Sequence, residues 1–94
     1  MSILQIPSHP GEVLKELYLD PLEMSEGKLA KHLCVPRTRI ERLVKEETSL
    51  TIDTAFRLAT FFSTTPEYWV NMQVNFDLAN ADVDVSAIMP HQAA

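Results

Sequence analysis

The chain has few of the residues on which catalytic and metal sites depend. Its single cysteine, Cys34, cannot form an internal disulfide, and we expect it to be a buried, reduced thiol. The two glycines, Gly11 and Gly27, are too few for a glycine-rich loop that holds phosphate. The three histidines are scattered and lack the spacing of metal ligands. These shortages predict a protein that is not an enzyme and that holds no metal or cofactor.

Long apolar runs are also missing. No stretch approaches the roughly 18–20 apolar residues that cross a membrane. The N-terminal sequence MSILQIPSH lacks the basic and apolar regions of a secretory signal, so we expect a cytoplasmic protein without a membrane partner. The hydrophobic fraction of 46% and the charged fraction of 22% are typical of a single globular domain. A domain of this length has a thin core, which dimerisation would help to stabilise.

Basic residues are outnumbered, 8 against 13 acidic residues, yet they are concentrated in one segment. Residues 28–45 contain six of them and a single acid, Glu41, whereas the rest of the chain has two basic and twelve acidic residues. This separation favours one surface for a polyanion and another for a cationic partner. The alternative is that the basic segment is only a solvated helix face. The six basic residues are Lys28, Lys31, Arg37, Arg39, Arg42 and Lys45.

Helix-start signals divide the chain into five short helices, so the predicted fold class is all-α. Serine and threonine cap helix N-termini with a side-chain oxygen, and proline suits the first helical position. The first helix is expected to end at Asp20, because the residue before Pro21 is disfavoured in the α region. The residues that mark the five starts are, in order, Pro10, Ser25, Pro36, Thr51 and Pro66.

The five helices form one predicted domain, residues 10–81. It lies between an N-terminal segment, residues 1–9, and a tail, residues 82–94, that we expect to be loosely ordered. Val83 and Val85 alternate with acidic residues, which leaves open one short strand in this tail.

The second and third helices, at about residues 25–45, are joined by a very short connection, and the third is basic. Two helices joined in this way form a helix-turn-helix, whose second helix enters the DNA major groove. When the apolar side of the third helix faces inward, helical geometry turns a polar row outward. Arginine can bind guanine through two hydrogen bonds, and threonine can contact the methyl group of thymine. The inward residues are Ile40, Leu43 and Val44, and the outward row is Thr38, Arg42 and Lys45.

Four segments carry a more specific resemblance: HPGEVLKELYLDPL, SEGKLAKHLCVPRTRIERLV, TIDTAFRLATFF and TTPEYWVNMQ. In this order and spacing, over about residues 8–80, the chain resembles the HigA-type antitoxins of toxin–antitoxin modules. These are lambda-repressor-like (Cro/C1-type) helix-turn-helix proteins. The resemblance implies a five-helix domain, usually dimeric, that represses its own operon and neutralises a HigB-type toxin, an mRNA-cleaving ribonuclease. A dimer implies a near-palindromic operator in double-stranded DNA.

The resemblance also assigns roles within the basic segment. By motif position, the base-reading sites fall on Arg37, Thr38 and Arg42, and the backbone-contacting sites fall on Arg39 and Lys45. Lys28, from the same segment, completes the predicted DNA-binding set.

The chain departs from the family pattern in two ways. Acidic residues stand where a phosphate-binding glutamine and a basic turn are usual, and they would weaken the attraction to DNA. Non-glycine residues stand at three helix ends where the family commonly has glycine. The acidic residues are Glu26, Glu46 and Glu47, and the three helix-end residues are Cys34, Glu46 and Ser63.

The fifth helix, expected at about residues 66–81, has two apolar stripes where one is enough for packing in the domain. The second stripe predicts an interface, and we expect a homodimer contact there. The alternative is that a small domain surrounds this helix more completely. The predicted contact residues are Trp69, Val70, Val74 and Phe76.

Two rival functions remain open from the sequence. One is a protein that masks a toxin with reduced or no DNA binding, because of the added acids. The other is a solitary helix-turn-helix regulator that has no toxin partner.

Overall fold

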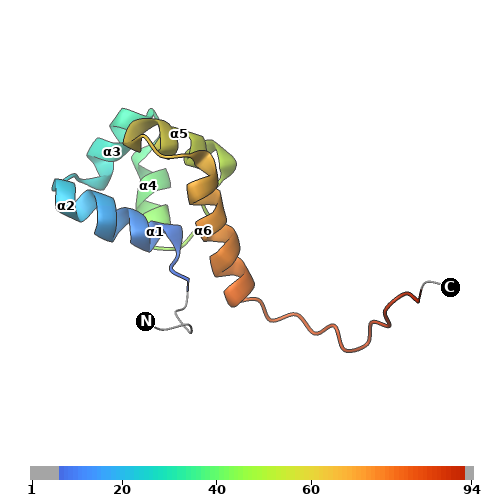
Figure 1. Ribbon diagram of the computed structural model, residues 1–94. Coiled ribbons are helices and arrows are strands. Elements are labelled where there is room, and N and C mark those ends of the chain that lie inside the picture. The colour runs from blue at the N-terminus through green and yellow to red at the C-terminus, as the bar shows by residue number, and fades with distance from the viewer. Residues whose placement is uncertain (1–6, 93–94) are drawn as a thin grey trace, which may run out of the picture.

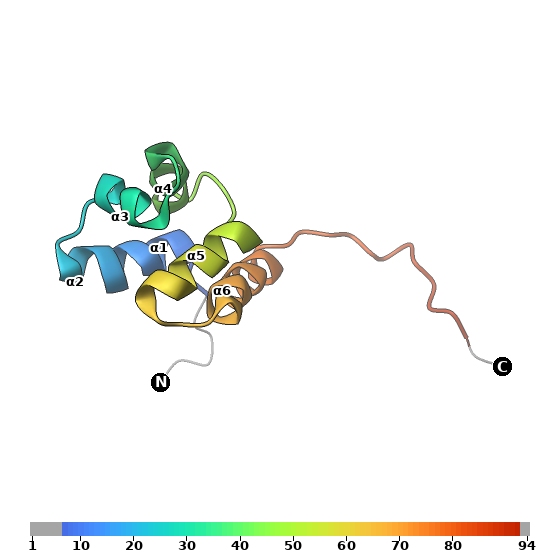
Figure 2. The ribbon, with the colours of Figure 1, turned by 90° about the horizontal axis from the view of Figure 1, so that it is seen from above.

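The computed structural model describes residues 7–92, so the predicted segment 1–9 and the end of the predicted tail lie partly outside it. Within these residues the chain forms helices and no strand, which confirms the all-α prediction. Figures 1 and 2 show the helices gathered in one body, from which the C-terminal residues extend to one side.

The first helix runs further than predicted. It consists of α1 (Pro10–Val13), a π-helical segment η1 (Leu14–Leu19) and α2 (Asp20–Leu22), which follow without a break. In the π-helical segment the bonds reach five residues back, and the Asp20 N–H donates to the carbonyl of Lys15. The prediction that Asp20-Pro21 ends the helix is therefore wrong. The wider turn lets the helix continue past the proline ring until Glu23, whose φ of 52° ends it.

The remaining helices begin where the capping residues predict. They are α3 (Glu26–Leu33), α4 (Arg37–Val44), α5 (Ile52–Phe62) and α6 (Pro66–Ala79). The Ser25 Oγ accepts from the N–H of Lys28 at 3.0 Å, and the Thr51 Oγ1 accepts from the N–H of Thr54 at 3.2 Å. These contacts satisfy N–H groups that have no partner within their helix, so the predicted caps are confirmed.

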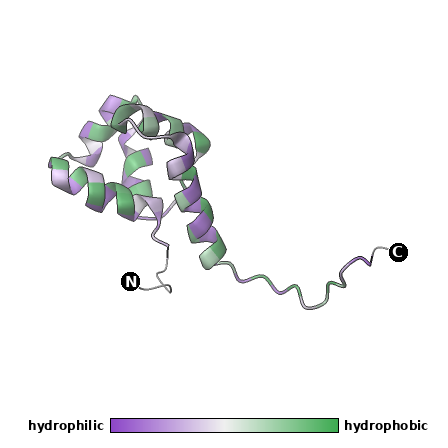
Figure 3. Ribbon diagram, viewed as in Figure 1, coloured by the Kyte–Doolittle hydropathy of each residue, from purple (hydrophilic) through white to green (hydrophobic). Residues whose placement is uncertain are grey.

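One apolar core joins all the helices. Leu14, Leu29, Ile40, Leu58 and Trp69 come from five different elements, and all five are fully buried. In Figure 3 the helices alternate between hydrophobic and hydrophilic colours along their length, as expected for helices that bury one side. The α1 helix packs against α4, and α5 packs against α6. The first helix therefore supports α4.

The three helix-end residues that stand where the family commonly has glycine adopt the left-handed conformation. The φ angles are 60° at Cys34, 61° at Glu46 and 56° at Ser63, whereas neither glycine has a positive φ. Each left-handed residue with a side chain costs roughly 1–2 kcal/mol. One prediction here is wrong: Cys34 is exposed rather than buried, because its side chain leaves the α3 end on the solvent side.

Gly11 is needed for close packing rather than for an unusual backbone angle. A Cβ atom at this position would lie 1.8 Å from the backbone oxygen of Leu43 in α4. The same atom at Gly27 would lie 3.4 Å from the flexible side chain of Arg37, which is an ordinary contact. The first helix can therefore approach the end of α4 only because residue 11 has no side chain.

Replacing Gly11 with alanine should lower the free energy of unfolding by about 3 kcal/mol, because the added carbon forces α1 away from α4. Gly27→Ala is the matched control and should raise it by about 1 kcal/mol, since alanine favours a helix interior. Urea unfolding of the two variants measures both effects. Equal stability of the two variants would contradict the close approach.

Candidate nucleic-acid interface

The α4 helix lies with its apolar side in the core and its polar side in solvent. Ile40 is fully buried and Leu43 is 2% exposed, and Val44 lies beside them at the edge of the core. Thr38 and Arg42, one helical turn apart, are both exposed on the other side. The orientation predicted from the sequence is therefore the one the structure has.

Two of the three arginines on α4 are paired with carboxylates. The Arg37 Nε donates to Glu41 at 2.7 Å, and Arg39 pairs with Asp53 at the start of α5. In the part of the chain that the structure describes, Arg42 pairs with no carboxylate. Exposed ion pairs of this kind contribute little to stability, so an approaching phosphate can compete with them.

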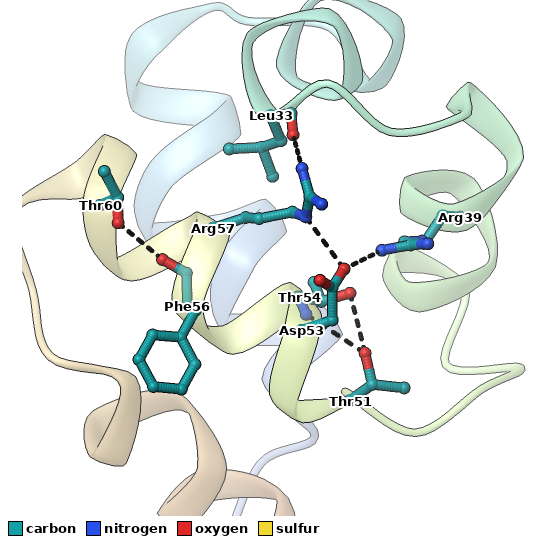
Figure 4. Close-up of polar contacts among 8 residues, drawn as sticks. All are labelled: Leu33, Arg39, Thr51, Asp53, Thr54, Phe56, Arg57 and Thr60. Carbon is teal, nitrogen blue, oxygen red and sulfur yellow. Dashed lines mark hydrogen bonds and ion pairs between the residues drawn. The ribbon is translucent and has the colours of Figure 1, made fainter.

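Asp53 links α4 to the rest of the domain, as Figure 4 shows. Its carboxylate accepts from the Nε of Arg57 at 2.9 Å as well as from Arg39. Arg57 also donates to the carbonyl of Leu33, at the end of α3, at 2.8 Å. The guanidinium groups of Arg57 and Arg39 lower the pKa of the Asp53 carboxyl below its ordinary value. The position of Arg39 is therefore set by a contact that the sequence did not predict.

A groove runs between α4 and the segment that leads into α5. Thr38 and Arg42 line one side, and hydroxyl-bearing residues of the segment line the other. Hydroxyl groups and the first N–H groups of a helix are common phosphate donors. Two of these hydroxyl residues, Thr48 and Ser49, were not predicted from the sequence, although they lie in the polar run before the Thr51 cap. The hydroxyl residues that the segment before α5 contributes to this groove are Thr48, Ser49 and Thr51.

A second groove brings the start of α3 beside the start of α4. The side chains of Lys28, Lys31 and Arg37 all border it, together with the Ser25 cap. Three basic side chains beside a helix N-terminus favour an anion. Glu26 occupies the first position of α3, so it opposes this attraction at the same end.

The segment before α5 is held in place by α6. The side-chain oxygen of Gln73, which is buried, accepts from the Leu50 N–H at 2.8 Å. The Gln73 amide group donates in turn to Asp77 at 2.9 Å. The first contact satisfies the N–H of Leu50, which would destabilise the fold if it were buried without a partner. The second contact orients the Gln73 side chain.

The α6 residues predicted to form a dimer contact lie in different places. Trp69 is fully buried and its Nε1 donates to Thr64 at 2.8 Å, so its assignment to a dimer surface is wrong. The Phe76 ring meets the His9 ring edge-on at 4.9 Å, and Val70 packs partly on the core. Val74 remains 46% exposed. Trp69 therefore faces the core and Val74 faces solvent, which the pattern of apolar residues alone could not decide.

Other kinds of site are not formed by the described residues. Among residues 7–92, no helix is both long and apolar enough to cross a membrane. In the same part of the chain, cysteine, histidine and acidic side chains form no group that could hold a metal ion.

Comparison with known proteins gives the same fold. The family model described as helix-turn-helix matches residues 14–69. An addiction module antidote protein of a HigA family from Coxiella burnetii is 45% identical, with a TM-score of 0.75 over 80% of this chain and 82% of that chain. Pseudomonas aeruginosa antitoxin HigA, solved with the higBA promoter, is 34% identical, with a TM-score of 0.76 over 78% and 79%. Antitoxin GraA in complex with its operator is 30% identical, with a TM-score of 0.83 over 100% and 99%.

The fold, the exposed polar row of α4 and the family match define the class of protein, a Cro/C1-type helix-turn-helix protein. At the identity and coverage found with the Coxiella burnetii and Pseudomonas aeruginosa proteins, the chain belongs to the HigA family of antitoxins. The resemblance inferred from the sequence is thereby confirmed. This family consists of DNA-binding antitoxins and not of enzymes.

Asp53→Asn should lower the melting temperature at pH 7, because it removes the shared partner of Arg39 and Arg57. Since the folded-state pKa of this carboxyl is lowered, its contribution is present above the ordinary value of 3.8 and is lost as the pH falls through the folded-state pKa. Thermal unfolding from pH 7 to pH 3 should therefore show a difference from the original chain that shrinks below about pH 4. Glu47→Gln, another exposed acid, is the control and should show no such pH-dependent difference.

Proposed function

We propose that the chain binds the operator of its own operon through α4 and represses transcription. The observation that carries this proposal is the exposed row of Thr38 and Arg42 opposite buried Ile40 and Leu43. A helix with this arrangement can enter a major groove, which is wide enough for it, and present arginine to guanine. The two related antitoxins solved with promoter or operator DNA support the assignment to DNA of this kind.

The structure favours a division of roles within the DNA-binding set. Arg42 has no carboxylate partner in the described residues and is proposed to read a base, together with Thr38. Arg37, which is also predicted to read a base, borders one groove with Lys28, and Lys28 is proposed to contact a phosphate. Arg39 and Lys45, which are both exposed, are proposed to contact the DNA backbone.

The proposed repressor is a homodimer. A partner copy would cover apolar side chains that α6 leaves in solvent, Val74 at 46% and Leu78 at 70% exposure. Two copies related by a two-fold axis would set two α4 helices about 34 Å apart, one turn of DNA. The operator is therefore expected to be near-palindromic.

The second part of the proposal is that the chain neutralises a HigB-type, mRNA-cleaving toxin. It rests on membership of the HigA family and on the acidic charge outside residues 28–45, which suits a basic partner. Co-expression with the neighbouring gene, followed by co-purification, tests it. Failure of a basic neighbouring product to co-purify would leave a solitary regulator.

A protein that masks the toxin with little DNA binding is the second candidate. The pairing of Arg37 with Glu41 and of Arg39 with Asp53 favours it, because each acid reduces the charge available to phosphates. A gel shift with the DNA upstream of the operon discriminates the two. Specific binding that falls steeply with salt supports the repressor, and toxin binding without any shift supports the masking protein.

Arg42→Ala should weaken operator binding by about 1–3 kcal/mol and relax the preference at one base pair, because it removes a base contact. Lys45→Ala is the matched variant and should weaken specific and scrambled DNA alike. Fluorescence anisotropy with both duplexes measures the two effects. The division of roles is refuted if the two variants lose the same affinity on both duplexes.

A further inference from the structure

Arg57 lies outside the basic segment of the sequence, yet the fold brings it beside the proposed DNA-binding surface. It stands on α5, one helical turn after Asp53. Figure 4 shows its guanidinium group between the end of α3 and the Asp53 carboxylate, with Arg39 of α4 on the other side of that carboxylate. We call the three residues Arg39, Asp53 and Arg57 the Asp53 cluster.

Both arginines of the Asp53 cluster donate to the same oxygen atom. The Nη1 of Arg39 and the Nε of Arg57 each bind Oδ2 of Asp53, the latter at 2.9 Å. The cluster therefore contains two positive charges and one negative charge. One arginine can leave while the other still neutralises the carboxylate.

Arg57 has a second attachment that holds it in place. Its Nη1 donates to the carbonyl of Leu33 at 2.8 Å, at the C-terminal end of α3. The last carbonyl groups of a helix lack partners within it and carry partial negative charge, which favours a guanidinium group there. In the described part of the chain, Asp53 is the sole ion-pair partner of Arg39. Arg39 is therefore the arginine that can exchange its partner.

Asp53 lies where the proposed interface needs positive charge. Its side chain lines the groove between α4 and the segment before α5, together with Arg42. The two guanidinium groups lower the pKa of its carboxyl below the ordinary value of 3.8, so this side chain is ionised at neutral pH. If Asp53 had no other partner, a phosphate that took Arg39 from it would leave a bare negative charge beside its own. Arg57 prevents this repulsion.

We propose that Arg57 is a positioning residue for DNA binding, which holds and neutralises Asp53 while Arg39 moves from Asp53 to a DNA phosphate. Arg57 acts in this exchange through Asp53 and not through a contact with DNA. The role rests on the proposed binding of operator DNA and extends it to a residue outside the predicted DNA-contacting set.

Salt-dependent binding to the duplex from upstream of the operon tests this role. Arg57→Gln should raise the Kd about tenfold and lower the slope of log K against log salt by about one, because one phosphate contact is lost. Lys15→Gln is the matched control, since Lys15 is also a basic residue outside the basic segment and also pairs with an aspartate, Asp20, at 3.0 Å. Its Kd should change less than about twofold.

Removing the carboxylate should restore binding. Asp53→Asn in the Arg57→Gln chain should return the salt slope to its original value and the Kd to within about threefold, because Arg39 no longer leaves a bare charge behind. Glu47→Gln in the same chain restores the same net charge without touching the cluster, and the slope should stay low. A merely structural role of Arg57 predicts no rescue by Asp53→Asn, since that double variant has lost the whole cluster. Arg57→Lys keeps the charge and should keep the slope.

An NMR titration of the original chain follows the two arginines without any substitution. When the duplex is added, the Nε–H signal of Arg39 should shift, whereas that of Arg57 should stay near its starting position. An unchanged Arg39 signal, or equal shifts of both signals, would overturn the exchange. This measurement decides the matter even if Arg57→Gln fails to show the circular dichroism of the folded chain.

The results also separate the role of Arg57 from operator binding itself. If the original chain binds the duplex, the role of Arg57 alone is overturned by equal effects of Arg57→Gln and Lys15→Gln. Rescue by Glu47→Gln that equals rescue by Asp53→Asn, or no rescue by either, overturns it as well. An original chain that binds no upstream DNA overturns both the role of Arg57 and the proposed operator binding.

Discussion

The position of α4 depends on the close approach between Gly11 and the backbone oxygen of Leu43. There is no room for a side chain between them, so this contact sets the distance between the first helix and α4. Two polar contacts complete the support. Asp53, at the start of α5, binds both Arg39 of α4 and Arg57, and Arg57 also binds the end of α3. Gln73 of α6 accepts a hydrogen bond from the Leu50 amide and so holds the loop between α4 and α5. The polar row of α4 can face solvent because these contacts hold its apolar side inward.

The surface formed by α3, α4 and the start of α5 carries both the basic side chains and acidic side chains that partly neutralise them. Glu41 and Asp53 form ion pairs with two of the arginines on α4, Arg37 and Arg39. Glu26 lies at the start of α3, next to the groove bordered by Lys28, Lys31 and Arg37. In the proposed interface, phosphate contacts would supply most of the sequence-independent affinity for DNA, so these acids would reduce binding to arbitrary sequences more than binding through Arg42. The apolar side chains that α6 leaves exposed, Val74 and Leu78, suit a protein partner rather than DNA.

Much of the fold could be predicted because its signals are local. The Ser25 and Thr51 caps and the inward Ile40 and Leu43 follow from residue type and helical spacing, whereas the helix end at Cys34 was indicated by the family resemblance. The contacts that involve distant residues could not be predicted in this way. The π-helical segment that carries the first helix past Pro21 depends on how that helix packs. Trp69 belongs to the core because α6 turns that side inward, a choice that two similar apolar stripes left open.

The candidate site, like the fold, was predictable only where the signals are local. Its exposed residues, Thr38 and Arg42, were predicted from the pitch of one helix, whereas the Asp53 pairing joins residues from two helices and was not. The exposure of Cys34 was also missed, because an apolar neighbourhood in sequence does not fix the direction of a side chain at a helix end.

The most direct test of the account is an NMR titration of the isotope-labelled protein with a duplex from upstream of its operon. The account predicts that the largest amide shifts fall on residues 37–45 and on the starts of α3 and α5, while the exposed side of α6 and residues 81–92 change little. Shifts concentrated on α6 and residues 81–92, with α4 unchanged, would contradict the claim that α4 is the DNA-reading surface.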